Sequence, residues 1–145
     1  MITVKQILDE KGYKVWTISP EAKVIDALKM MADRGVGGLI VYDKDDVVGI
    51  MSERDYARKI VLMGRHSQDT AVREIMSSHI YGVQLDSTAE ECMALMTDKH
   101  IRHLPVCKDE KLAGIISIGD VVKAIMTQQK VTIENLENYI MGKYQ

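Results

Sequence analysis

The spacing Ser-x-x-Asp occurs twice in this chain, each time within the pattern GIxSxxD. One copy contributes Ser52 and Asp55, and the other contributes Ser117 and Asp120. A hydroxyl three residues before a carboxylate is typical of a capping box, in which both side chains bond backbone N–H groups at a helix start. A carboxylate fixed in this way can also accept hydrogen bonds from a ligand. The motif therefore predicts two helix starts and two candidate binding sites.

A second group of reactive residue types is concentrated in one stretch of the sequence. It comprises His100, His103, Cys107, Asp98 and Asp109. These types would suit zinc, but His-x-x-His followed by Cys does not match the usual spacing of structural zinc sites. No nucleophile with a base repeats as a unit. We therefore expect neither a metal site nor an enzyme.

Both motif copies belong to an internal repeat, because a shift of 65 residues aligns 15–61 with 80–126 without a gap. The pairs that are identical are Met31 and Met96, Asp33 and Asp98, Leu39 and Leu104, Val41 and Val106, Gly49 and Gly114, Ile50 and Ile115, Ser52 and Ser117, Asp55 and Asp120, and Ile60 and Ile125. The clustering of four pairs in GIxSxxD indicates a duplicated structural unit.

Each half predicts the element order β-α-β-β-α. An extended piece at 15–18 or 80–83 precedes a first helix, for which Ser19 with Pro20, or Ser87 with Glu90, supplies the expected start. Gly35 is expected to end the helix of the first half. Two apolar runs, joined by the acidic stretch DKDD at 43–46 or by its polar counterpart KDEK at 108–111, predict a hairpin.

The second helices are expected at Glu53–Met63 and Ile118–Gln129, and the tail predicts one more amphipathic helix. Residues 64–76 are expected to form a polar linker that ends in VREIM, which echoes TVKQIL at 3–8. The predicted division is a first domain at 8–66, a linker at 67–76, a second domain at 77–133 and a C-terminal helix at 134–145.

With this topology, with both GIxSxxD motifs and with RHLPV at 102–106, the chain resembles a tandem pair of cystathionine-β-synthase-type (CBS) domains, also called a Bateman module, of the stand-alone bacterial type. The resemblance implies an α/β (α+β) fold of two repeats packed about a pseudo-twofold axis. It also implies two clefts that bind AMP, ADP, ATP, NAD(H) or S-adenosyl compounds.

The resemblance assigns roles to particular residues. Asp55 and Asp120 are expected to accept hydrogen bonds from ribose hydroxyls, with Ser52 and Ser117 nearby; the simpler interpretation of all four is capping. Arg102 and His103 occupy positions that meet phosphate in the family, whereas Gly37 and Gly38 occupy them in the first half. The two clefts are therefore expected to differ. The further candidates are Arg54 for phosphate, Val15, Thr17, Ile18, Ile80 and Gly82 for adenine, Gly38 for close backbone approach, and Pro105, expected mainly to shape its strand.

Composition excludes several classes of protein. Hydrophobic residues make up 46% and charged residues 28% of the 145-residue chain, as in ordinary globular proteins. A net charge of -2 argues against a nucleic-acid partner, and no apolar run is long enough to predict a membrane span. The N-terminus resembles neither a signal nor a transit peptide, so a cytoplasmic location is expected. Cys92 and Cys107 are expected to be reduced core thiols.

The predicted function is a regulatory, non-catalytic module that needs no cofactor, binds an adenine nucleotide (AMP, ADP, ATP or NAD(H)) and signals energy or redox state to an unknown protein partner. The alternative is a structural interaction module with vestigial clefts. A homodimer is expected, with exposed apolar faces on the second helices forming the contact. The residues predicted for these faces are Tyr56, Ile60, Val121, Val122 and Ile125.

Overall fold

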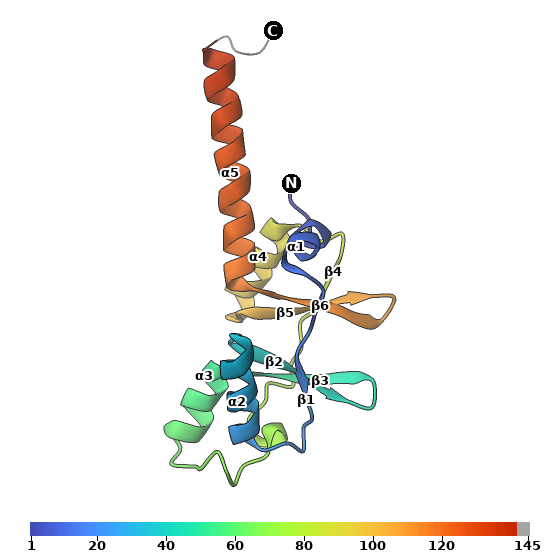
Figure 1. The fold of residues 1–145 in the computed structure, drawn as a ribbon, viewed down its shortest axis with the longest axis vertical. Helices are drawn as coiled ribbons and strands as arrows, with labels where there is room; N and C mark the ends of the chain where they lie inside the picture. Colours follow the sequence, from blue (N-terminus) through green and yellow to red (C-terminus); the bar gives the residue numbers. More distant parts are fainter. Residues whose placement is uncertain (142–145) are drawn as a thin grey trace. The chain divides into compact units, whose positions relative to one another are not determined.

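The computed structural model describes residues 1–141 of the chain, which form two compact units (Figure 1). The first-repeat unit is continuous and spans Lys14–Tyr81. The second-repeat unit combines Met1–Tyr13 with the chain from Gly82 onward. The N-terminal segment therefore packs with the second repeat, so the compact units do not follow the continuous boundaries of the sequence repeats.

Both units contain a three-stranded sheet with helices, which confirms the predicted α/β class and the order β-α-β-β-α. The elements of the first-repeat unit are β1 (Thr17–Ile18), α2 (Val24–Arg34), β2 (Gly38–Asp43), β3 (Asp46–Ser52), α3 (Glu53–Tyr56), a π-helical turn η1 (Ala57–Val61) and a 3-10 turn η2 (Val72–Glu74). Those of the second-repeat unit are α1 (Val4–Lys11), β4 (Val83–Gln84), α4 (Ala89–Lys99), β5 (His103–Lys108), β6 (Lys111–Ser117) and α5 (Ile118–Ile140).

The two sheets have the same topology. In each one the middle strand pairs parallel with the short first strand and antiparallel with the last strand. The hairpins turn through two residues, Lys44–Asp45 and Asp109–Glu110, all with positive φ. Positive φ at both turn positions is the type I′ geometry, whose twist matches that of the flanking strands. The two polar stretches thus form the hairpin turns, as predicted.

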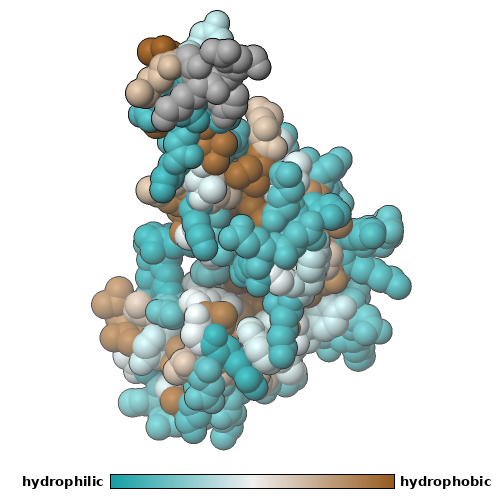
Figure 2. All heavy atoms as spheres, turned by 45° about the horizontal axis from the view of Figure 1, so that its top comes forward, coloured by the Kyte–Doolittle hydropathy of each residue, from teal (hydrophilic) through white to brown (hydrophobic). Residues whose placement is uncertain are grey.

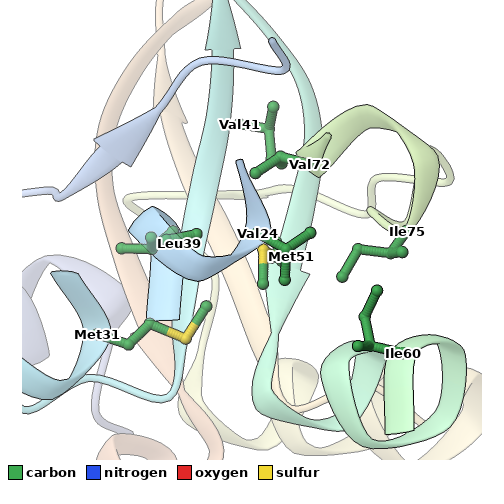
Figure 3. Close-up of a cluster of buried hydrophobic side chains, with 9 residues drawn as sticks. Val24, Met31, Leu39, Val41, Met51, Ile60, Val72 and Ile75 are labelled. Atoms are coloured by element: carbon green, nitrogen blue, oxygen red, sulfur yellow. The ribbon is translucent and has the colours of Figure 1, made fainter. Parts of the chain in front are cut away.

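Each unit has its own apolar core. In the first-repeat unit, residues of the sheet and of α2 meet Ile60 of η1, together with Val72 and Ile75 from the segment before the second repeat (Figure 3). In the second-repeat unit, Leu8 of α1, Met96 of α4 and Leu104 of β5 are buried. The segment expected as a polar linker thus supplies core residues of the first-repeat unit.

The first helices begin later than predicted. Helix α2 begins after Lys23 with no side-chain cap, and Ser19 instead accepts a bond from the Glu21 N–H. Backbone carbonyls outside the helix accept the hydrogen bonds that a capping side chain would accept, because Val24 N–H donates to the Thr70 carbonyl and Ile25 N–H to the Ser67 carbonyl.

Helix α4 is capped by Thr88, which accepts a bond from the Glu91 N–H, and not by Ser87 with Glu90. The prediction of Gly35 as the end of α2 is confirmed by its left-handed conformation, with φ 65°.

The second helices also differ from prediction. In the first repeat the expected helix is α-helical only over α3 and continues as the π-helical turn η1. In the second repeat α5 runs unbroken to Ile140, so the expected separate C-terminal helix is wrong within the described residues. No Gly or Pro lies between Gln129 and Ile133 to end the helix. Residues 142–145 of the predicted helix lie outside the described residues.

The segments 2–11 and 70–77, here called the pre-repeat segments, make equivalent backbone hydrogen bonds. Val4 N–H donates to Ser87 and Lys5 N–H to Leu85, whereas Ala89 N–H donates to Ile2. In the first-repeat unit the matching bonds are Val72 to Ala22, Arg73 to Pro20 and Val24 to Thr70. The echo between VKQIL and VREIM thus marks two segments with one structural role. Each of them packs on the repeat that does not directly follow it.

Candidate ligand site

In the first-repeat unit, Asp55 is buried and its carboxylate is surrounded by donors. Ser52 caps α3, and its N–H and hydroxyl both bond Asp55 Oδ2, at 3.0 and 3.1 Å. The other oxygen, Oδ1, accepts a bond from the Ser77 hydroxyl at 3.4 Å and pairs with Lys59 Nζ at 3.3 Å. The side chain of Asp55 is 12% exposed. Both carboxylate oxygens are therefore engaged inside the unit.

In the second-repeat unit, Asp120 is capped in the same way but paired differently. Ser117 N–H donates to Asp120 Oδ2 at 2.8 Å, and Lys11 Nζ of α1 donates to the same oxygen at 2.7 Å. Lys11 Nζ also donates to the Ile115 carbonyl at 2.9 Å. Asp120 is more exposed than its counterpart, at 23% of its side chain. Lys11 and the Ser117 backbone both bond Oδ2, and the Ser117 hydroxyl also bonds the carboxylate, so Oδ1 is the oxygen more open to a donor from outside the unit.

Partial burial alone would raise the pKa of Asp120. The hydrogen bonds from Lys11 and from the Ser117 backbone, with the positive charge of Lys11, outweigh burial and hold this pKa below its ordinary value. Asp120 is therefore a carboxylate at neutral pH, which is the form that accepts hydrogen bonds from a diol.

The turn before the middle strand is fixed to the start of the second helix in both units. Glu53 N–H donates to the Gly37 carbonyl at 3.1 Å, and Ile118 N–H donates to the Arg102 carbonyl at 2.9 Å. His103 pairs with Ser117 across the hairpin, as Gly38 pairs with Ser52. The structure thus brings Arg102, His103, Ser117 and Asp120 together at one end of the second hairpin. The matching positions in the first-repeat unit come together with Gly37 and Gly38 in place of the basic pair.

The residues predicted to meet adenine lie on or beside the short first strands. Thr17 and Ile18 form β1, with Val15 two residues before it, whereas Ile80 and Gly82 precede β4. Val15, Ile18 and Ile80 are half-buried, and Thr17 and Gly82 are exposed. Arg54 is exposed in the first turn of α3, beside Asp55.

Pro105 has no backbone N–H, and this changes how its strand pairs with the short first strand. It is buried in β5, the middle strand of its sheet. In the first-repeat unit the matching Ile40 N–H donates to the Trp16 carbonyl, a bond that proline cannot make. The pairing of β4 begins one residue later, at Val83 with Val106.

The glycines of the two motifs are explained by close packing of the pre-repeat segments. A Cβ at Gly49 would lie 2.7 Å from Met76 Sδ and 2.9 Å from the Ser77 carbonyl oxygen. A Cβ at Gly114 would lie 2.8 Å from Leu8 Cδ1. The G of GIxSxxD therefore leaves room for the segment that supplies Lys11 in one unit and Ser77 in the other.

Asp120 opens onto a pocket between α1 and α5, within the second-repeat unit. The pocket has a volume of about 430 Å³, which is within the range of small-molecule sites. Lys11 and Lys123 supply positive charge there, and Glu10 a second carboxylate. The remaining lining residues are Ile2, Gln6, Ile7, Ala124 and Thr127. Neither Arg102 nor His103 lines it.

The sequence reasoning missed three residues that contact the motif carboxylates: Lys11, Lys59 and Ser77. Lys11 and Ser77 belong to the segments around the VKQIL and VREIM echo, which was the available signal. Neither residue falls within the 65-residue repeat alignment, so the alignment could not pair them with the motif.

The structure also shows how the possible metal ligands and the two cysteines are arranged. Within residues 1–141 no three His, Cys, Asp or Glu side chains lie close enough to hold a metal ion. Cys92 and Cys107 are both free; burial, and then the charge of Glu91, raise the pKa of the Cys92 thiol to about 11. Cys107 is only half-buried, so just one of the two thiols lies in the core.

The described helices include none that is both long enough and apolar enough to span a membrane.

The faces predicted for a homodimer need correction. Ile60 and Val121 are buried in their own units, at 2% and 0% exposure. Tyr56 and Ile125 are half-buried, and only Val122 of the predicted set is exposed.

The chain belongs to the CBS-domain family: the sequence model of the CBS domain matches it twice, over residues 2–62 and 72–127. Together the two matches include both GIxSxxD motifs, the first pre-repeat segment and the second pre-repeat segment from Val72 onward. The fold inferred from the repeat is therefore that of a CBS-domain pair.

Individual proteins resemble the chain over most of its length. The mitochondrial CBS domain-containing protein CBSX3 of Arabidopsis thaliana is 36% identical, covering 98% of this chain and 73% of that protein. A solved CBS-domain protein from Burkholderia ambifaria is 48% identical with a TM-score of 0.84, covering 88% of this chain and 96% of that one. The CBS domain pair of protein MJ0100, solved with 5′-methylthioadenosine and S-adenosyl-L-methionine, shares the fold with a TM-score of 0.78 at 21% identity, covering 88% of this chain and 98% of that one.

Proposed function

We propose that this CBS-domain pair is a non-catalytic sensor that binds an adenine nucleotide through the second copy of its motif. The observation that carries the proposal is the Asp120 carboxylate, which is ionised, partly exposed and open to a pocket of suitable size. Its more open oxygen suits the donors of a ribose diol. The adenosine ligands of the MJ0100 pair support the same ligand class by analogy of fold.

The phosphate is assigned to the basic residues around this motif. Arg102 precedes the strand that pairs with Ser117, and its guanidinium is suited to clasp a phosphate with two parallel bonds. Lys123 also lines the pocket and supplies a second positive charge beside Lys11. Changes in the nucleotide occupancy of this site would signal energy or redox state to a protein partner.

The first copy of the motif is better explained as a structural element. Asp55 is more buried than Asp120, and both of its carboxylate oxygens have donors from its own unit. A ligand would have to displace Ser77 or Lys59 to reach this carboxylate. This favours the vestigial interpretation for the first motif alone, and it leaves one working site in the chain.

Calorimetry with AMP, ADP, ATP and NAD tests the proposal, with GMP as the control ligand. We expect Asp120→Asn to weaken the best adenine ligand by about tenfold to a hundredfold, because ribose hydroxyls left partly unpaired cost about 1–3 kcal/mol. The matched variant Asp55→Asn should change affinity much less. Absence of binding by every adenine nucleotide at millimolar concentration would refute the proposal. An equal loss in both variants would refute the assignment to the second motif.

The phosphate assignment has its own test. Arg102→Ala should weaken AMP but leave adenosine affinity nearly unchanged, since only AMP offers the group that a guanidinium clasps. Titrating wild type and variant with both ligands measures the difference directly. If adenosine loses as much affinity as AMP, Arg102 supports the fold or the base site, and the phosphate is bound elsewhere.

A further inference from the structure

The C-terminal half of α5 exposes an unusual amount of apolar surface. Helix α5 packs on its own unit through Val121, which is buried, and Ala124, which is half-buried. Gln128 makes the next contact, because its Oε1 accepts a bond from the Ile2 N–H at 3.3 Å. The C-terminal end of α5 projects past α1 and α4 (Figure 1). Apolar side chains lie at the surface of this projecting end (Figure 2).

Five of the exposed apolar residues of α5, together with Gln129, form a regular line, here called the seam. Its members are Val122, Met126, Gln129, Ile133, Leu136 and Ile140. Successive members are separated alternately by four and three residues, which is the a/d spacing of a coiled coil. The apolar members are exposed by 39% at Val122, 64% at Met126, 55% at Ile133, 57% at Leu136 and 81% at Ile140. The unit itself therefore leaves the seam uncovered, and the spacing indicates that a second helix covers it.

Charge identifies the covering helix. Lys130 and Glu137 each follow a d residue of the seam and so share the e position of the heptad. In an antiparallel pair of identical helices the e positions face each other, which brings Lys130 opposite Glu137 of the partner subunit. In a parallel pair they would face the g positions, Thr132 and Tyr139, which are uncharged.

We infer that the seam pairs antiparallel with the seam of a second copy of this chain. An anionic membrane surface is a poorer match, because residues 129–141 carry one Lys and two Glu. Gln129 supports a defined register, since a single polar residue in an apolar seam specifies alignment at some cost in stability. The contact shares Val122 with the second-helix faces predicted from the sequence, but its other members lie farther along α5. It does not depend on nucleotide binding.

Sedimentation of the full chain at micromolar concentration tests the inference. The wild type should sediment as a dimer, at twice the 16.3 kDa of one chain. Leu136→Glu should raise the dissociation constant by about tenfold or more, because pairing would bury an unpaired charge. Val131→Glu is the matched control, since Val131 is 50% exposed on the opposite side of the same helix and should leave the dimer intact. Circular dichroism confirms that the variants remain folded.

The charge pair provides a test of orientation. Lys130→Glu should weaken the dimer, and adding Glu137→Lys should restore it, because the exchange rebuilds opposite charges across an antiparallel pair. A monomer at every concentration, or a dimer that Leu136→Glu leaves unchanged, overturns the inference. If Leu136→Glu and Val131→Glu weaken the dimer equally, the assignment of the contact to the seam is overturned. Failure of the double variant to recover overturns the antiparallel arrangement.

Discussion

The two copies of GIxSxxD are identical at the defining positions, yet their carboxylates have different surroundings. Ser77 donates its backbone N–H to the Ile50 carbonyl at 2.9 Å and its hydroxyl to Asp55. In the second-repeat unit a single side chain replaces both donors, because Lys11 bonds the Ile115 carbonyl and Asp120. The comparison teaches that a motif fixes where a carboxylate lies, whereas the pre-repeat segment fixes how available it is.

The cause of the difference is the conformation of the pre-repeat segments. Helix α1 continues for eight residues, from Val4 to Lys11, and its last residue carries a long side chain back to the motif. The turn η2 ends after three residues, and the chain then extends so that Ser77 pairs with Ile50 as an isolated bridge. An extended segment brings backbone donors to the strand edge, and a helix brings only side chains. Asp120 is consequently the more exposed of the two carboxylates.

The largest expected effect comes from filling the glycine positions. Gly49→Ala should destabilise the protein by about 1–3 kcal/mol, because a Cβ there meets the Ser77 backbone as well as Met76. Gly114→Ala should cost less, because the Cβ there meets only the flexible Leu8 side chain. Free energies of unfolding from urea titration measure both.

A second substitution sharpens this test. In a chain that already carries Leu8→Ala, Gly114→Ala should cost less stability than it costs in the wild type, because the side chain that meets the new Cβ has been removed. Met76→Ala should reduce the cost of Gly49→Ala only slightly, because the Ser77 carbonyl remains 2.9 Å from the added Cβ. If both glycine variants lose the same stability, the pre-repeat segments do not differ in the way described.

Much of the fold could be predicted from the sequence because its signals are local. The apolar runs predict the strands, the polar stretches between them form type I′ turns, and Ser52 and Ser117 cap the helices that follow. The start of α2 was missed because its free N–H groups bond Thr70 and Ser67, which are remote in sequence. Lys11 was missed for the same reason: its contact with Asp120 joins the N-terminus to the second repeat.

The pH dependence of stability should separate the two carboxylates. The pKa of Asp120 lies below its ordinary value of 3.8, so ionised Asp120 stabilises the fold above that pH. This contribution is lost as the pH falls through the lowered pKa. Lys11→Met should raise the pKa of Asp120, because burial then opposes ionisation with less compensation. Stability should therefore fall at neutral pH and converge with that of the wild type in acid.

The smallest expected effect is the loss of stability that Lys11→Met causes at pH 7. Lys11 is 35% exposed, so solvent screens the pair, and Lys11→Met should cost less than about 1 kcal/mol. The matched variant is Lys59→Met, since Asp55 keeps its bonds from Ser52 and Ser77 without Lys59. Urea titrations at neutral and acidic pH should show that Lys11→Met changes the slope of stability with pH more than Lys59→Met does. If Lys59→Met changes this slope as much, Asp55 depends on its lysine as strongly as Asp120 does, and the proposed difference in availability disappears.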